Sequence, residues 1–271
     1  MKTLPDVDEV MRQVSAKKKY QHLDPDLVAF IASAEAKKRA SLKEAVKATA
    51  NKLHQVGWAY FEEQPPYANH LQELAGLTQD VHAMDSRDFC TKLMQEHAST
   101  RERLPILADF YSTLFQDIQP VHSILDLACG FNPLAVDWMP IEKTVTYSAC
   151  DIFQDMADFL QRFFEHFQIP GNASVNNLLT HIPPEKAQVA LLLKTLPCLE
   201  QAEKDSARRI LTGIQAQYLI ISFPVRSIGG KEKGMLAHYS SQFENLLADL
   251  GWNYTKFLFT SELVYRVERG K

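Results

Sequence analysis

An alternation of short apolar runs with amphipathic stretches constrains the fold of this chain more than any other feature. Four β-rich runs follow residue 118, at 122–127, 144–150, 188–193 and 218–223. Two amphipathic stretches lie between them, at 154–167 and 200–214. Nearly continuous apolar strands that alternate with helices form a parallel sheet with both faces covered. The sequence therefore predicts an α/β fold with a doubly wound, Rossmann-like sheet.

The end of the chain departs from this alternation. Residues 254–259 and 263–267 both have strand character, and only the segment 260–262 separates them. Parallel neighbours need a connection of about a dozen residues or more, so these two strands are expected to pair as an antiparallel hairpin. A parallel sheet that ends in such a hairpin is the layout of S-adenosylmethionine-dependent methyltransferases, and dehydrogenases generally lack it.

The first 118 residues have helical periodicity and almost no strand signal. The stretch 31–56 is rich in Ala, Lys and Glu and carries apolar residues at helical spacing. A polar segment with two prolines, 62–70, follows it. Further helical segments are expected at 71–77, 89–97 and 101–115. We therefore expect two domains, an all-helical one over residues 1–118 and the α/β one over residues 119–271.

Composition argues against several classes of protein. No apolar stretch approaches the roughly 20 residues that cross a bilayer, and the opening residues MKTLPDVDEVMRQ lack the apolar core of a signal peptide. The four cysteines are widely scattered, and the histidines have no spacing typical of metal ligands. This pattern argues against a metal site or a disulfide framework and favours reduced thiols, so we expect a cytoplasmic protein.

The net charge of −4 is unevenly distributed along the chain. Between Lys17 and His54 there are nine basic and four acidic side chains, a local balance of +5. A local basic patch matters more to a polyanion than the balance of the whole chain does. Lys17, Lys18 and Lys19 are therefore candidates for contacts with RNA, and the alternative is a solvated helix face.

The loop after the first predicted strand is a candidate cofactor site. Asp126 closes that strand, and Ala128 and Gly130 lead into the next element. In doubly wound sheets, ligands bind beyond the carboxyl ends of the strands, beside the first one. A dinucleotide site would supply three glycines for the pyrophosphate, and this loop has a single one. S-adenosylmethionine has no phosphate, so small residues suffice for it; a purely structural turn is the alternative.

A second acidic residue follows the second predicted strand. Asp151 lies 25 residues after Asp126 and directly before Ile152. A carboxylate at this position can accept hydrogen bonds from both ribose hydroxyls, and a helix N-cap is the alternative. In this layout the adenine edge would be read after the third strand of the sheet, which comes before the run 188–193 and makes that run the fourth strand. Because Asn177 and Leu178 stand there, any contact would come from a neutral amide or from the backbone.

Five sequence blocks, in order along the chain, point to one family. They are HASTRER (97–103), LDLACGFNPLA (125–135), ACDIF (149–153), LLLKTLPCLE (191–200) and SFPVRSIGGKEKGM (222–235). In these blocks the chain resembles the aminoglycoside-resistance 16S ribosomal RNA methyltransferases of the Arm/Rmt type. Members of that family modify a guanine in the decoding site, at position 1405, on its N7 atom.

The resemblance implies a helical N-terminal domain that docks on the 30S ribosomal subunit and a seven-stranded methyltransferase domain. It also implies S-adenosyl-L-methionine as the cofactor and 16S ribosomal RNA in the assembled 30S subunit as the partner. We expect a monomer that binds neither DNA nor a membrane. The chain departs from the family pattern at Asn177, where relatives commonly have an acidic residue.

The same resemblance suggests roles for residues of the blocks. His97 and one arginine, Arg101 or Arg103, would hold the methionine part of the cofactor; surface arginines at a helix start are the alternative. Lys194 ends the fourth predicted strand. A lone lysine in a buried strand is costly unless it is paired or functional, so Lys194 is expected to line the methyl-transfer site and to position its contents.

The HASTRER block also predicts how its helix begins. Ser99 or Thr100 would be the N-cap, and Glu102 would complete a capping box.

The last block follows the fifth predicted strand. Its Gly229-Gly230 pair gives a flexible loop, and Arg226, Lys231 and Lys233 are the kind of donors that hold phosphates around a displaced nucleotide. A solvated surface loop is the alternative.

The chemistry expected from the family needs no general base. Guanine N7 has a lone pair and carries no proton, so the enzyme contributes alignment, with Lys194, Arg226 and Lys231 as positioning residues. The target base would have to be unstacked into the pocket, where Phe131 and Phe223 are candidate walls or plain core residues. Two alternatives are a small-molecule methyltransferase with a helical lid and a non-catalytic RNA-binding protein on a degenerate methyltransferase fold.

Overall fold

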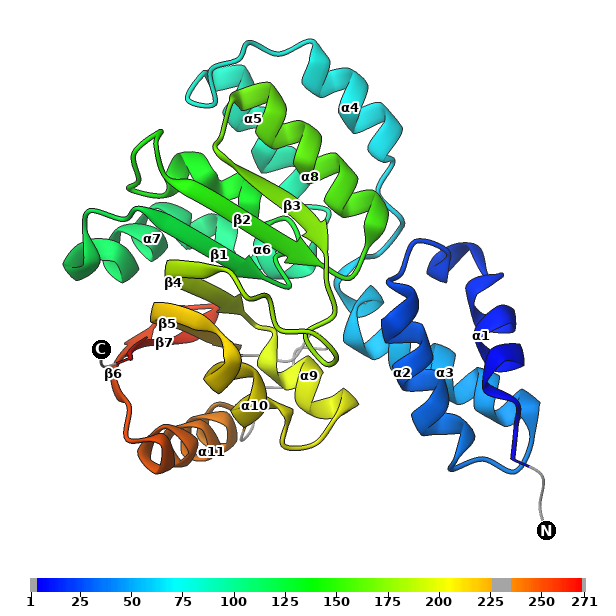
Figure 1. Ribbon diagram of the computed structural model, residues 1–271. Helices are drawn as coiled ribbons and strands as arrows, with labels where there is room; N and C mark the ends of the chain where they lie inside the picture. Colours follow the sequence, from blue (N-terminus) through cyan, green and yellow to red (C-terminus); the bar gives the residue numbers. More distant parts are fainter. Residues whose placement is uncertain (1–3, 226–234, 270–271) are drawn as a thin grey trace.

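The computed structural model describes residues 4–225 and 235–269 (Figure 1). Within these residues a seven-stranded sheet has the order β3-β2-β1-β4-β5-β7-β6. The strands are β1 (Ser123–Leu127), β2 (Thr146–Asp151), β3 (Gly171–Val175), β4 (Lys186–Leu193), β5 (Gln215–Pro224), β6 (Asn253–Leu258) and β7 (Glu262–Glu268). The first five run parallel, and β7 runs antiparallel to both β5 and β6. The predicted α/β fold and its C-terminal hairpin are confirmed.

Helices surround this sheet. The α-helices are α1 (Val7–Ser15), α2 (Pro25–Ala36), α3 (Leu42–Val56), α4 (Tyr67–Ala75), α5 (Met84–Met94), α6 (Ala98–Arg103), α7 (Leu107–Phe115), α8 (Gln154–Phe167), α9 (Leu196–Ala202), α10 (Ser206–Gly213) and α11 (Met235–Leu250). Short 3₁₀ helices include η1 (Lys18–Tyr20), η2 (Trp58–Tyr60), η3 (Leu104–Ile106) and η5 (Asn132–Trp138). Helix α8 has the bounds predicted for it, because its apolar residues recur at helical spacing and its buried face is rich in Phe.

Three stretches predicted as continuous helices are interrupted. The stretch 31–56 is divided between α2 and α3, and α3 starts at its own N-cap, where the Ser41 hydroxyl accepts a hydrogen bond from the Glu44 amide. The stretch 101–115 is divided by η3, whose Pro105 has no amide hydrogen for a helical bond. The stretch 200–214 is divided between α9 and α10 at Asp205, which has a φ of +64°.

The predicted start of the HASTRER helix is wrong. Helix α6 begins at Ala98 after the N-cap His97, and no side chain makes a capping hydrogen bond there. The Thr100 hydroxyl donates to the Met94 carbonyl at 2.7 Å. The Glu102 carboxylate accepts a hydrogen bond from Lys194 at 2.6 Å, so it is directed to the end of β4 and not to a capping box.

The N-terminal helices divide into two groups by what they pack against (Figure 1). Helices α1, α2 and α3 pack on one another and form a lobe at one side of the sheet. Helix α4 packs on α8, and α5 and α7 pack on η5, so these helices pack against elements that connect the strands and not against the lobe. The lobe reaches the rest of the molecule through α3, which contacts α9, and through η2.

Residues 4–225 and 235–269 offer neither a membrane span nor a metal site. None of their helices combines the length and the apolar character that a membrane span requires. They also contain no cluster of three or more His, Cys, Asp and Glu side chains able to hold a metal ion.

Candidate active site

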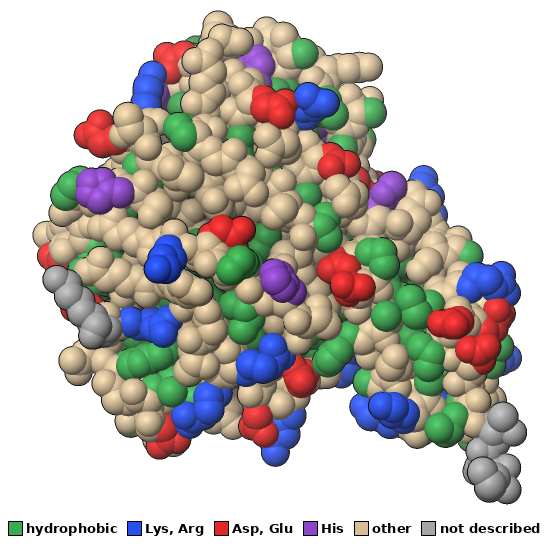
Figure 2. All heavy atoms as spheres, in the orientation of Figure 1, with side chains coloured by type: hydrophobic (Ala, Val, Ile, Leu, Met, Phe, Trp, Pro, Cys, Tyr) green, Lys and Arg blue, Asp and Glu red, His purple; other side chains and the backbone are tan. Residues whose placement is uncertain are grey.

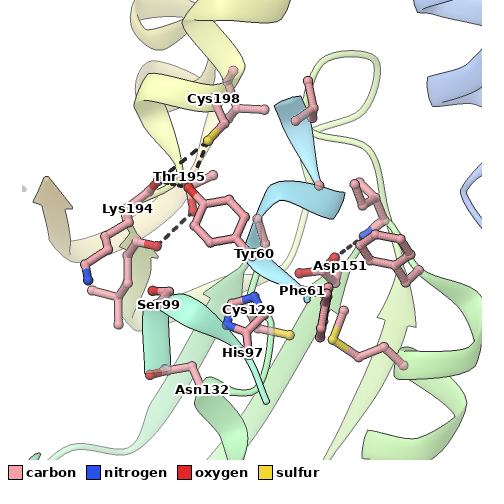
Figure 3. Close-up of a pocket in the computed structure, with 18 of the residues that line it drawn as sticks. Tyr60, Phe61, His97, Ser99, Cys129, Asn132, Asp151, Lys194, Thr195 and Cys198 are labelled. Carbon is pink, nitrogen blue, oxygen red and sulfur yellow. Dashed lines mark hydrogen bonds between the residues drawn. The ribbon is translucent and has the colours of Figure 1, made fainter. Parts of the chain in front are cut away.

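A cavity of about 70 Å³ lies where the carboxyl ends of β1, β2 and β4 meet (Figure 3). The loop after β1 and the ends of β2 and β4 form its floor, α6 contributes one wall, and the α3–η2 segment of the N-terminal lobe contributes the other. The residues that line the cavity include Tyr60, Phe61, His97, Ser99, Arg103, Ala128, Cys129, Asn132, Asp151, Ile152, Lys194, Thr195 and Cys198.

The loop after β1 is shaped by residues in the left-handed region. Ala128 and Gly130 both have a φ of +52°. A Cβ atom on Gly130 would lie 2.6 Å from Cε1 of His97, so this position admits no side chain. The Gly130 amide donates a hydrogen bond to the Asp151 carboxylate at 2.8 Å. The predicted loop and the predicted second acid are therefore joined directly.

Asp151 has the features of a ligand-binding carboxylate. It is 7% exposed and lines the cavity. Its two oxygens accept hydrogen bonds from the amides of Gly130, at 2.8 Å, and Ile152, at 2.7 Å. A carboxylate has about four lone-pair sites, so acceptor capacity remains for two hydroxyl groups. Burial raises the pKa of Asp151 to about 6, although the backbone amides oppose this shift, and the group is ionised at neutral pH.

Asp126 has a structural position beneath the loop and does not line the cavity. Its Oδ2 accepts hydrogen bonds from Asn132 Nδ2, at 2.8 Å, and from the Tyr147 hydroxyl, at 2.7 Å. Burial raises its pKa to about 7, although these hydrogen bonds oppose the shift. Asn132 in turn accepts a hydrogen bond from Arg103 Nη1 at 2.9 Å, so Asp126 supports the cavity wall through Asn132.

Two buried cations stand at the end of the cavity near α6 and β4. Arg103 is 1% exposed, and its Nε and Nη2 donate to the Glu262 carboxylate at 2.7 and 3.2 Å. Lys194 Nζ lies 2.6 Å from Glu102 and 3.5 Å from Glu262. Burial raises the pKa of Glu262, but Arg103 and Lys194 more than offset this and lower it. The two cations therefore face two carboxylates, the buried Glu262 and the half-exposed Glu102, and Arg103 and Lys194 are the charged hydrogen-bond donors at this end of the cavity.

The two arginines left open by the sequence lie in different places. Arg103 lines the cavity. Arg101 points away from it, with a side chain 44% exposed and paired to the exposed Glu62 at 2.9 Å. Lys194 also lines the cavity, as expected from the sequence, and its φ of +59° is uncommon for a residue with a side chain.

An aromatic wall faces the cavity. The rings of Tyr60 and His97 are stacked, with centroids 5.4 Å apart and planes at 17°. Phe61 meets the His97 ring edge-on at 4.9 Å. His97 is 8% exposed, and its Nδ1 has no hydrogen-bond partner. Burial, aided by the charges of Arg103 and Lys194, lowers the pKa of His97 to about 3, so the imidazole is neutral.

Tyr60 and Phe61 were not among the predicted site residues. The run GWAYFEE, at 57–63, does place three aromatic residues just before the polar break. That cluster of aromatic residues could have indicated a buried contact, because aromatic side chains next to a polar segment must be covered by another part of the fold.

Several predicted residues do not line the cavity. Asn177 and Leu178 are buried, and Asn177 Oδ1 accepts a hydrogen bond from the Leu179 amide while its Nδ2 has no partner. Phe131 is fully buried beside Phe61 and is a core residue. Phe223 is buried and stacks on Tyr239 at 5.5 Å.

The remaining predictions concern the surface and the last block. Lys17, Lys18 and Lys19 are exposed on and beside η1. Lys19 Nζ lies 3.1 Å from His54 Nδ1 and 5.2 Å from the centre of the Trp58 ring. Arg226, Lys231 and Lys233 lie outside the described residues.

The side chains and backbone groups around the cavity suit S-adenosylmethionine. The loop at Gly130 leaves no room for a side chain, Asp151 has free acceptor capacity, and Arg103 and Lys194 provide charged donors of the kind that bind a carboxylate. The order of the sheet and its antiparallel end are those of the same class. Fold and site together place the chain among the S-adenosylmethionine-dependent methyltransferases.

Comparison with known proteins narrows this class to one family. The family model described as "Ribosomal RNA methyltransferase (FmrO)" matches residues 16–266, and the chain belongs to this family. It is 34% identical over 266 residues to the 16S rRNA (guanine(1405)-N(7))-methyltransferase of Frankia casuarinae, covering 97% of this chain and 94% of the relative. It is 32% identical to the enzyme of the same name from Micromonospora echinospora, covering 97% of both chains.

Solved structures agree with this assignment. The 16S rRNA methyltransferase RmtF in complex with S-adenosyl-L-homocysteine superposes with a TM-score of 0.83 at 28% identity, over 97% of this chain and 98% of that one. The 16S rRNA methylase RmtB gives a TM-score of 0.78 at 27% identity, over 98% and 99% of the two chains.

Proposed function

We propose that this chain transfers the methyl group of S-adenosylmethionine to N7 of guanine 1405 of 16S ribosomal RNA, within the 30S subunit, and so confers aminoglycoside resistance. The observation that carries the proposal is the near full-length similarity to enzymes named for that reaction. The cavity supports it, because its residues suit the cofactor that the reaction requires.

Different residues of the cavity bind different parts of the cofactor. Asp151 accepts hydrogen bonds from the ribose hydroxyls, because its carboxylate is ionised and half its lone pairs are free. Arg103, and not the exposed Arg101, binds the methionine carboxylate, since it lines the cavity next to Lys194. The cofactor supplies an electrophilic methyl group on a sulfonium ion.

The site would promote the reaction by aligning guanine N7 with the methyl group of the cofactor. Guanine N7 carries a lone pair and no proton, so no residue needs to accept a proton before the methyl group moves. His97 is neutral and buried against Tyr60, and it serves as part of the wall and not as a base. Lys194, fixed by Glu102 and Glu262, is the positioning residue on the side where the target base would enter.

The α1–α3 lobe is the proposed docking unit for the ribosomal subunit. Lys17, Lys18 and Lys19 are exposed there. A groove of about 610 Å³ between α2 and α3 is lined by four more basic residues, Lys38, Arg39, Lys47 and Lys52, and by two acidic ones, Glu35 and Glu44, of which Glu35 pairs with Lys38 and Arg39. Figure 2 shows Lys and Arg side chains, mixed with acidic ones, on the lobe at the right of the molecule. Phosphate contacts from such side chains fix the position of a protein on RNA.

This assignment makes the docking unit smaller than the predicted helical domain of residues 1–118. Helices α4, α5 and α7 pack on α8 and η5, and they support the methyltransferase sheet. We therefore propose that docking belongs to α1–α3, in a cytoplasmic protein that acts as a monomer on the assembled subunit.

Expression in a susceptible bacterium tests the proposal. We expect resistance to kanamycin and gentamicin with neomycin largely effective, because a methyl group on N7 adds bulk and charge only where the first class of drug makes close contact. Asp151→Ala, expressed at the same level, is expected to abolish resistance. Resistance to apramycin instead would contradict the proposal and indicate an adenine target.

A further inference from the structure

We propose that Tyr60 and His97 form a cation-recognising wall, through which the pocket binds the sulfonium of S-adenosylmethionine in preference to the uncharged thioether of S-adenosylhomocysteine. This inference rests on the proposed function, because it concerns the same cofactor. It adds a specificity role for Tyr60, a residue contributed by the N-terminal lobe and not by the methyltransferase sheet.

The position of the sulfur follows from the ends of the cavity. In the cofactor, the sulfur atom is bonded on one side to the ribose carbon and on the other to the amino-acid chain. The proposed ribose ligand, Asp151, and the proposed carboxylate ligand, Arg103, both line the same cavity. Arg103 is hydrogen-bonded to Asn132. Figure 3 shows the Tyr60 ring between Asp151 on one side and Lys194 on the other, with His97 next to it. Arg103 and Lys194 both contact Glu262, so we place the sulfur of a cofactor that reaches from Asp151 toward them beside the aromatic wall.

The Tyr60 side chain is held in place by contacts of its ring and of its hydroxyl group. Its face stacks on His97, with ring centres 5.4 Å apart. Its hydroxyl donates a hydrogen bond to the Lys194 carbonyl at 3.2 Å and lies 2.9 Å from Cys198 Sγ. A ring fixed in this way presents a preorganised face. The face of an aromatic ring attracts a cation within about 6 Å, and the attraction grows when water is excluded.

His97 strengthens this wall because it carries no charge. Its burial and the neighbouring cations Arg103, Lys194 and Arg101 keep the imidazole neutral. A protonated imidazole would repel a sulfonium, whereas the neutral ring leaves the attraction of the Tyr60 ring unopposed. Nδ1 of His97 makes no hydrogen bond within the described residues, so no protein group competes for this side of the ring.

The wall would also promote turnover. When the methyl group leaves, the S–CH₃ electron pair stays on sulfur, and the positive charge passes from the sulfonium to the methylated purine. The attraction to the aromatic faces is then lost at the cofactor. S-adenosylhomocysteine is held less tightly, and product inhibition is reduced.

Calorimetry with both ligands tests the inference. We expect the wild-type protein to bind S-adenosylmethionine about fivefold or more tightly than S-adenosylhomocysteine. Tyr60→Leu should lower the affinity for S-adenosylmethionine by about fivefold and change the affinity for S-adenosylhomocysteine by less than about twofold. Tyr60→Phe is the matched control: it loses the hydroxyl bond to Lys194 but keeps the ring, so the preference between the two ligands should remain.

A measurement on the wild-type protein alone covers the case in which Tyr60→Leu fails to fold. An analogue with a protonated amine in place of the sulfonium should also bind more tightly than S-adenosylhomocysteine. Equal binding of the charged and uncharged ligands by the wild type, or an equal loss of both in Tyr60→Leu, would overturn the inference and leave the proposed function intact. A wild-type protein that binds neither ligand would overturn both.

Discussion

Replacing Gly130 by Ala tests whether the loop after β1 is built around a closed contact with His97. The new methyl group would lie 2.6 Å from Cε1 and 2.8 Å from Nε2 of the His97 ring. That ring is stacked on Tyr60 and touched edge-on by Phe61, so it can yield only by giving up these contacts and moving into the cavity that it lines. The substitution therefore creates a steric conflict at the centre of the proposed cofactor site.

Two costs add up in Gly130→Ala. A residue with a side chain in the left-handed region costs about 1–2 kcal/mol, and Gly130 has a φ of +52°. Overpacking of a well-filled site costs about 1–3 kcal/mol more. We therefore expect the free energy of unfolding to fall by about 2–5 kcal/mol. S-adenosylhomocysteine should also bind at least about tenfold more weakly, because the displaced ring would enter the cavity.

Urea unfolding and calorimetry measure the two effects, and the chain offers a matched control. Gly251 has a φ of +68° but no heavy atom within 4 Å of its potential Cβ, so Gly251→Ala should cost only the backbone term of about 1 kcal/mol. Adding His97→Ala to Gly130→Ala should recover about 1–3 kcal/mol relative to the sum of the single changes. If Gly130→Ala costs no more than Gly251→Ala and leaves ligand binding intact, the steric argument is refuted.

Two further predictions concern the carboxylate and the basic surface. Asp151→Asn should weaken S-adenosylhomocysteine binding by about 1–3 kcal/mol at pH 7.5. The wild-type affinity should be full above pH 7 and fall as the pH is lowered through 6, because the pKa of Asp151 is raised to about 6 and the protonated acid loses acceptor capacity. A calorimetric series from pH 5 to 8 should show an affinity that does not change with pH for Asp151→Asn. If the affinity of Asp151→Asn falls with pH in the same way as that of the wild type, Asp151 does not belong to the site. Reversing Lys17, Lys18 and Lys19 to Glu should weaken binding to 30S subunits and flatten its salt dependence, without changing cofactor affinity. Unaltered competition binding across a salt series would reject the docking role.

The sequence predicted the sheet well because its pattern is local. The apolar runs that became β1, β2, β4 and β5 are bounded by turn residues, and the short 260–262 segment permits only a hairpin. Helix breaks were harder to foresee. The interruption before α3 depends on the Ser41 cap, while the apolar periodicity of 31–56 continues across it. Periodicity reports which face is buried and does not report where the chain turns.

The site was predictable as far as its residues belong to short blocks. His97, Arg103, Asp151 and Lys194 belong to these blocks, and the structure brings them to one cavity; their roles there stay predictions. Their partners could not be found in this way. The choice of Arg103 over Arg101 depends on Glu262, which is 159 positions away along the chain and is buried at the start of β7.

Tyr60 was missed for a similar reason. It belongs to a segment before the polar break, far from any block, and it enters the cavity because α3 and η2 carry the lobe against the end of β4. Local sequence could mark Tyr60 as a residue to be buried, but only the packing of α3 on α9 shows which surface covers it.

The central claim is tested most directly by incubating the protein with purified 30S subunits and S-adenosylmethionine labelled in its methyl group, and then mapping the label on 16S ribosomal RNA. We expect one labelled nucleotide, guanine 1405, with the methyl group on N7, and no label with the Asp151→Ala variant. Label at any other nucleotide, or transfer to free small molecules with none to the subunit, would contradict the account.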